Sequence, residues 1–154
     1  MNIPTLKISI LGTVGAVGAA IAELLGGWTG ALQTLLIFMG IDILTGIMVA
    51  FIFHSSPKTE NGGVESNAMF KGLCRKIVIL FIVIMAVRLG QLIEKEYIKN
   101  IIIIAFIGNE GVSIIENAEL MKIKNLGLIT WLVTHVKDIA NSAMEKLIGA
   151  DKDD

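Results

Sequence analysis

The sequence has few of the residues on which most catalytic and metal sites depend. Its single cysteine, Cys74, excludes an internal disulfide, and its two histidines, His54 and His135, are too few and too far apart for a zinc site. Charged residues make up only 18% of the chain, and the net charge of −1 provides no basic field for nucleic acid. The composition therefore predicts no cofactor, no metal site and no nucleic-acid partner.

Long apolar runs are what the sequence has in abundance, since 54% of its residues are hydrophobic. Residues 28–53 form a run of 26 residues with one charge, Asp42, near the middle. A helix needs about 20 such residues to cross a hydrocarbon layer of about 30 Å. An aspartate at mid-span costs about 2.5–3.5 kcal/mol on insertion scales, so Asp42 is expected to face protein or water.

Three further apolar runs, over residues 8–25, 77–93 and 98–115, predict an all-α, polytopic membrane protein with about four spans. We expect residues 1–117 to form the transmembrane domain. Residues 118–154 are expected to form a cytoplasmic or interfacial amphipathic helix with a frayed acidic end.

The amphipathic helix is predicted from apolar residues that recur at steps of three and four, with Lys137, Asp138, Glu145 and Lys146 on the other side. The apolar residues are Ile129, Leu132, Val133, Val136, Ile139, Ala140, Ala143 and Leu147.

The first apolar run allows two interpretations. Lys7 before it and the small residues at 20–22 resemble a signal peptide with its cleavage site, and cleavage would leave three spans. As a stable span, it places Gly12, Ala16 and Ala20 on one face, where small residues permit close packing between membrane helices. The same residues also suit a weakly hydrophobic helix that simply contains many alanines.

Lysine and arginine are distributed unevenly between the two sides of a four-span protein. The side with both termini and the loop 54–76 has ten of them, whereas the other side has only Lys95 and Lys99. The positive-inside rule therefore predicts cytoplasmic termini and a cytoplasmic loop in the bacterial inner membrane. The ten residues are Lys7, Lys58, Lys71, Arg75, Lys76, Lys122, Lys124, Lys137, Lys146 and Lys152.

Asp42 and Arg88 are each 12 residues from the predicted cytoplasmic loop, at His54 and Lys76 respectively, which is about 18 Å along a helix. They can therefore pair across two antiparallel spans, which lowers the cost of either charge in lipid. Alternatively, Arg88 extends its side chain to the outer interface, because it is close to the end of its span.

A polar stripe follows the second half of the fourth run. Such side chains can hydrogen-bond to neighbouring helices or line water, and together with Asp42 they suggest a lumen in an oligomer. The residues are Asn109, Glu110, Ser113, Glu116 and Asn117.

Three motifs occur in order: Asp42-x-x-x-Gly46, Lys71-Gly72-x-x-x-Lys76, and the run N-E-G-x-S-I-x-E-N over 109–117. Together they resemble the toxin-secretion/phage-lysis holin family over about residues 30–125. The resemblance implies a non-enzymatic protein that oligomerises in the bilayer and lets an endolysin or large toxin leave the cytoplasm.

The chain differs from the usual family pattern in the absence of proline over 118–125 and in a later apolar stretch with Trp131. A small proton-coupled transporter that uses Asp42 and Glu110 is the rival interpretation, and an accessory membrane subunit is another.

The predicted topology can be tested with cysteine probes in a Cys74→Ser background. We expect an impermeant thiol reagent to label Lys95→Cys and not Ser56→Cys in intact cells, because the lysine distribution places residue 56 in the cytoplasm. Labelling of Ser56→Cys would reverse the orientation.

Overall fold

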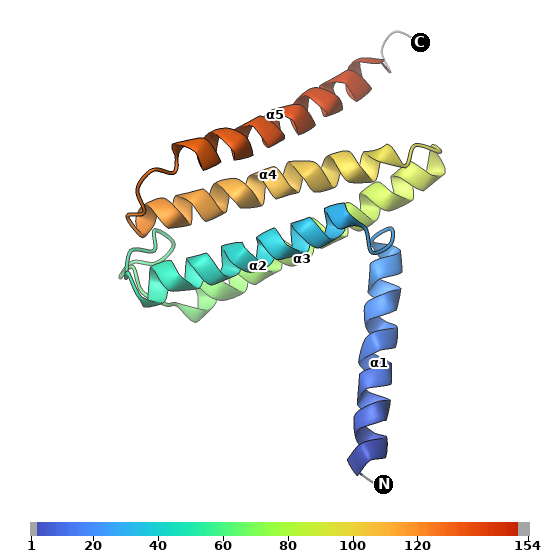
Figure 1. The fold of residues 1–154 in the computed structure, drawn as a ribbon, viewed down its shortest axis with the longest axis horizontal. Coiled ribbons are helices and arrows are strands. Elements are labelled where there is room, and N and C mark those ends of the chain that lie inside the picture. The colour runs from blue at the N-terminus through green and yellow to red at the C-terminus, as the bar shows by residue number, and fades with distance from the viewer. Residues whose placement is uncertain (1–2, 151–154) are drawn as a thin grey trace.

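The computed structural model describes residues 3–150 and contains five helices over that range (Figure 1). No strand occurs among the described residues, so the predicted all-α class is confirmed. The predicted acidic end, 151–154, lies outside the described residues. The helices are α1 (Ile3–Leu24), α2 (Gly30–Phe51), α3 (Ser66–Leu92), α4 (Tyr97–Leu120) and α5 (Gly127–Ala150).

Helices α1, α2 and α4 are long and apolar enough to cross a membrane. Their positions agree with three of the four predicted spans. Helix α3 is not among these three, because Arg75, Lys76 and Arg88 surround its apolar middle. The predicted span over 77–93 therefore stays a prediction.

Helix α4 lies at the centre of the arrangement and contacts α2, α3 and α5 (Figure 1). On α2, the buried residues are spaced by three, four, three and seven, which is the seam pattern of helices that pack lengthwise. The apolar core between α2, α3 and α4 contains Leu32, Leu35, Met39, Ile79, Val83 and Ile103.

Helix α1 points away from the other helices (Figure 1), and none of its membrane-length stretch is buried. Gly12, Ala16 and Ala20 are all exposed, and a Cβ on Gly12 would meet no atom within 4 Å. Their predicted role in helix packing therefore stays a prediction.

Gly26 joins α1 to the rest of the chain in a conformation that favours glycine, with φ of +83°. The Lys99 ammonium donates a hydrogen bond to the Gly26 carbonyl at 2.8 Å. A Cβ on Gly26 would lie 2.7 Å from Lys99 Cδ and 2.9 Å from Val87 Cγ2. Leu25 beside it is buried in the core. The start of α4 thus fixes the point where α1 leaves the bundle.

We expect Gly26→Ala to lower the thermal unfolding midpoint in detergent more than Gly27→Ala. Both glycines have positive φ, so each substitution adds strain of about 1–2 kcal/mol. Only the Cβ at 26 displaces Lys99, because the space beside Gly27 is open. Equal midpoints would contradict a role for the Lys99 contact.

Candidate functional site

Three charged side chains from three helices meet inside the bundle. The Lys76 ammonium of α3 lies 2.6 Å from Asp42 Oδ2 of α2 and donates to Glu110 Oε2 of α4. The side chains of Lys76, Asp42 and Glu110 are 12%, 11% and 2% exposed. We call these three residues the charge cluster. One lysine therefore bridges a carboxylate of α2 and a carboxylate of α4.

The helix bounds explain why these residues meet. Asp42 is nine residues before Phe51 (51 − 42), and Lys76 is ten residues after Ser66 (76 − 66). Each is therefore about 14–15 Å from the end of the bundle that contains the 52–65 loop. Glu110 is ten residues before Leu120 (120 − 110), at the same depth on α4.

Asn117 extends the charge cluster by two turns of α4. Its Nδ2 donates to Asp42 Oδ1 at 3.2 Å and to Thr45 Oγ1 at 3.0 Å. A Cβ on Gly46 would lie 3.8 Å from Nδ2, an ordinary van der Waals distance, so the amide itself does not require glycine there. Among the described residues, no fully buried side-chain nitrogen or oxygen lacks a hydrogen-bond partner. The polar network is therefore satisfied within one chain.

The pair considered between Asp42 and Arg88 does not form. Arg88 is exposed near the end of α3, where its Nη1 donates to Gln91 Oε1 at 3.4 Å. The pairing hypothesis is wrong because α3 begins at Ser66, so Lys76 is already deep in the helix and not at its entrance. The partner of Asp42 is thus one of the predicted motif residues.

The predicted polar stripe on α4 divides between two environments. Glu110 and Asn117 are buried, as a spacing of seven residues allows, whereas Asn109 and Glu116 are exposed. Ser113 is half-buried and lines an open pocket with Glu116, Asn117 and residues of the 52–65 loop. Asn109 and Glu116 have the same seven-residue spacing, so spacing alone does not show which of the two pairs is buried.

Two motif residues contribute no contact to the charge cluster. Lys71 is exposed on the first turns of α3, and a Cβ on Gly72 would meet no atom within 4 Å. Their roles in the motif have no explanation in the described structure.

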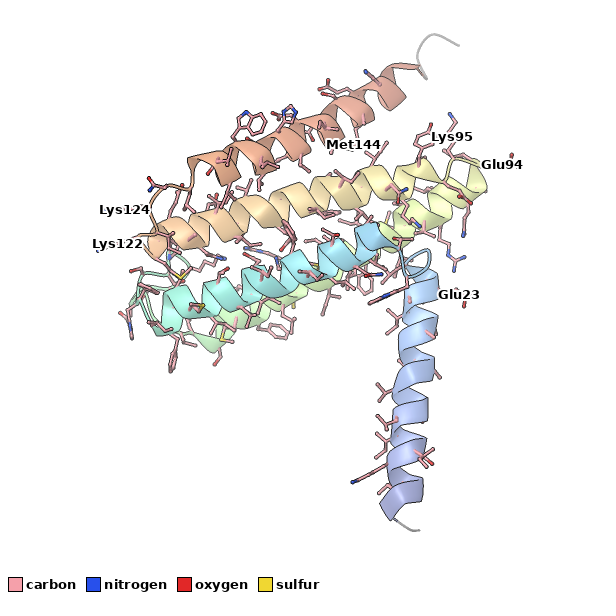
Figure 2. The ribbon with its side chains drawn as sticks, viewed as in Figure 1. Glu23, Glu94, Lys95, Lys122, Lys124 and Met144 are labelled. Carbon is pink, nitrogen blue, oxygen red and sulfur yellow. The ribbon has the colours of Figure 1, made fainter. Side chains whose placement is uncertain are left out.

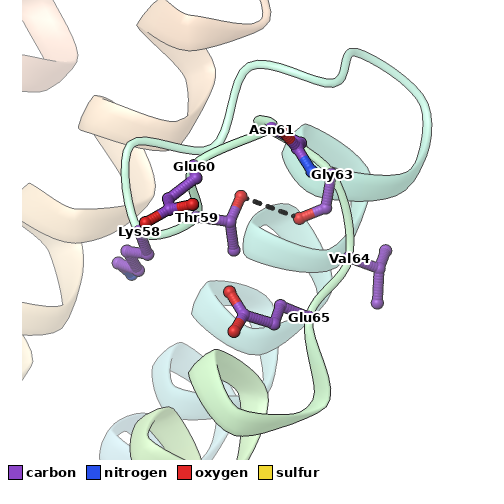
Figure 3. Close-up of a pocket in the computed structure, with 7 residues that line it drawn as sticks. All are labelled: Lys58, Thr59, Glu60, Asn61, Gly63, Val64 and Glu65. Carbon is purple, nitrogen blue, oxygen red and sulfur yellow. Dashed lines mark hydrogen bonds between the residues drawn. The ribbon is translucent and has the colours of Figure 1, made fainter.

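The loop between α2 and α3 folds onto itself (Figure 3). Thr59 Oγ1 donates to the Gly63 carbonyl at 3.0 Å, and the Ser56 amide donates to the Gly62 carbonyl at 3.0 Å. The small pocket in Figure 3 is lined by residues of both charges, including Lys58, Glu60 and Glu65. Within residues 3–150, no group of three or more potential ligands is assembled to hold a metal ion. The loop is therefore held by its own hydrogen bonds at one end of the bundle.

Three apolar, membrane-length helices and a buried ion network define a small helical membrane protein. Among known proteins, the model of the bacteriophage holin family matches residues 19–141. The chain belongs to this family, which suggests a non-enzymatic membrane protein.

Two curated relatives come from Clostridium perfringens. An uncharacterized 14.9 kDa protein in the nagH 3′ region is 30% identical over 104 residues, which cover 66% of this chain and 73% of the relative. An uncharacterized protein from strain 13 / Type A is 29% identical over 102 residues, which cover 65% of this chain and 70% of the relative. No solved structure matches the chain.

We expect Lys76→Met to lower the free energy of unfolding in detergent by about 3–5 kcal/mol, because it leaves two buried carboxylates without a cation. The triple variant Asp42→Asn, Lys76→Met and Glu110→Gln should lose less than Lys76→Met alone, since it removes every charge of the cluster.

Arg88→Gln is the matched control and should be nearly silent, because Arg88 is exposed. A triple variant less stable than Lys76→Met would show that the carboxylates do not depend on Lys76.

Proposed function

We propose that this chain acts as a holin. Copies assemble in the bacterial inner membrane and open a path through which an endolysin or a large toxin leaves the cytoplasm. The observation that supports this most is the family match over residues 19–141, which includes all of α2, α3 and α4. These are the helices that form the buried charge cluster.

In this proposal the charge cluster holds the subunit together and does not react. Apolar side chains gain little from each other in lipid, because lipid tails are equally apolar. An ion pair between helices has no such substitute in the membrane. Asp42, Lys76, Glu110 and Asn117 therefore act as inter-helix residues that keep α2, α3 and α4 in one register.

The cluster geometry disfavours the proton-coupled transporter. Asp42 and Glu110, the carboxylates that such a transporter would use, both contact the ammonium of Lys76. Asp42 also accepts from Asn117. A substrate cation would therefore have to displace the Lys76 ammonium from both carboxylates.

The charges at the two ends of the bundle favour one orientation. Lys122 and Lys124 lie at the end with the 52–65 loop, whereas Glu23, Glu94 and Lys95 lie toward the opposite end (Figure 2). We propose that the loop end faces the cytoplasm, in accordance with the positive-inside rule.

We expect expression of the chain with a cytoplasmic wall hydrolase to collapse the membrane potential and release the hydrolase, because the assembled chain opens the inner membrane. A potential-sensitive dye and hydrolase activity outside the membrane measure the two effects. Lys76→Met at equal membrane abundance serves as the matched control, since it has the same length and a broken charge cluster. Normal growth with an intact potential at high abundance of the parent chain would contradict the proposal.

A further inference from the structure

Helix α5 packs on α4 through two glycines. A Cβ on Gly108 would lie 3.0 Å from Lys137 Cβ, and a Cβ on Gly111 would lie 2.8 Å from Val133 Cγ1. The missing side chains therefore let the two helices approach closely, as small residues do between membrane helices. Ala140, one turn beyond Lys137, is also buried. The contact therefore aligns particular residues of α4 with particular residues of α5, Gly108 with Lys137 and Gly111 with Val133.

The contact is at the middle of α4. Gly108 is 11 residues after Tyr97 and 12 before Leu120, in a helix of membrane length. Helix α5 runs back along α4 toward the turn between α3 and α4 (Figure 1). If α4 crosses the membrane, the first half of α5 therefore lies at the depth of the hydrocarbon.

One exposed face of α5 is polar, whereas Leu128, Trp131 and Ile139 are exposed elsewhere on the helix. Thr134, Asp138, Asn141 and Glu145 are spaced by four, three and four, so they share one face, and all four are exposed. We call them the polar face of α5. Asp138 follows Lys137 directly and is therefore close to the depth of Gly108. A carboxylate at this depth requires water or a partner, and lipid offers neither.

The interior of the bundle does not provide that water. Asp42 and Glu110 are occupied by Lys76, and Leu35, Val83 and Ile103 fill the neighbouring core. In the first half of α5, by contrast, no residue is fully buried, and the half-buried Val133 and Lys137 lie against α4. Water at the depth of Asp138 must therefore lie outside the single subunit.

We propose that the polar face of α5 lines the water-filled path of the assembled holin. The inference rests on the proposed function and names the helix that faces the lumen. Asp138, as the carboxylate nearest the middle, makes the path favour cations over anions. This proposal also places the end of α5 at the outer side of the membrane. The lysine distribution had predicted a cytoplasmic position for the same part of the chain.

The packing of α5 on the middle of α4 can be tested by a crosslink in a Cys74→Ser background. We expect Gly108→Cys with Lys137→Cys to form a disulfide in isolated membranes. The usual Cβ–Cβ separation of a disulfide is about 3.5–4.5 Å, so only a small outward shift is needed. Gly108→Cys with Asp138→Cys is the matched control, because residue 138 is on the exposed side. Absence of the first crosslink would overturn the placement of α5.

The lumen is tested by currents through planar bilayers. In the same background, a water-soluble, positively charged methanethiosulfonate should reduce the current of Asp138→Cys several-fold. Ile139→Cys should be unaffected, because this apolar neighbour is off the polar face. Asp138→Asn with Glu145→Gln should lower the preference for cations over anions.

The outcomes separate the two proposals. A parent chain that forms no conducting path contradicts the holin function itself. A conducting parent whose Asp138→Cys and Glu145→Cys variants are insensitive to the reagent overturns only the lumen assignment. The lumen assignment is also overturned if the reagent labels the cysteines at 138 and 145 from the cytoplasmic side while no path is open. In that case α5 would lie at the membrane surface.

Discussion

One lysine ammonium between two carboxylates fixes the relative positions of the three bundle helices. A shift of one helical turn, about 5.4 Å, would leave Asp42 or Glu110 without a cation inside the bundle. Apolar contacts such as those of Leu35 and Val83 cannot prevent such a shift, because they are replaced by contacts with lipid at little cost. The apolar core thus fills the bundle, whereas Lys76 determines its register.

This constraint explains why one short run of α4 has several kinds of residue. Glu110 and Asn117 face α2 and α3, where they complete the polar network. Gly111, on another side, leaves space for Val133 of α5. Asn109 and Glu116 occupy the exposed flank between these contacts. A helix that packs against three neighbours needs a different surface for each, so the run 109–117 combines charge, amide and glycine within a few turns.

The sequence was sufficient for the helical class and for three membrane-length helices, because apolar runs such as 28–53 have no other stable state in lipid. It also identified Asp42, Glu110, Asn117 and Lys76 as motif or polar residues. Their pairing was not predictable from local pattern. Polar residues over 66–76 resemble a loop by composition, so α3 was expected to begin about three turns too late, and this error in depth favoured Arg88 over Lys76.

The contact between α4 and α5 shows a second limit of sequence pattern. Val133 and Ala140 belong to the predicted apolar face and pack on α4, but Leu132 and Ile139 from the same face are exposed. Glycine gave no periodic signal for this contact, because Gly108 and Gly111 act through the side chains they lack. Once the interior polar groups are satisfied within one chain, the groups that still require water lie on the outer surface. In the proposed assembly, water would therefore lie between subunits and not inside one of them.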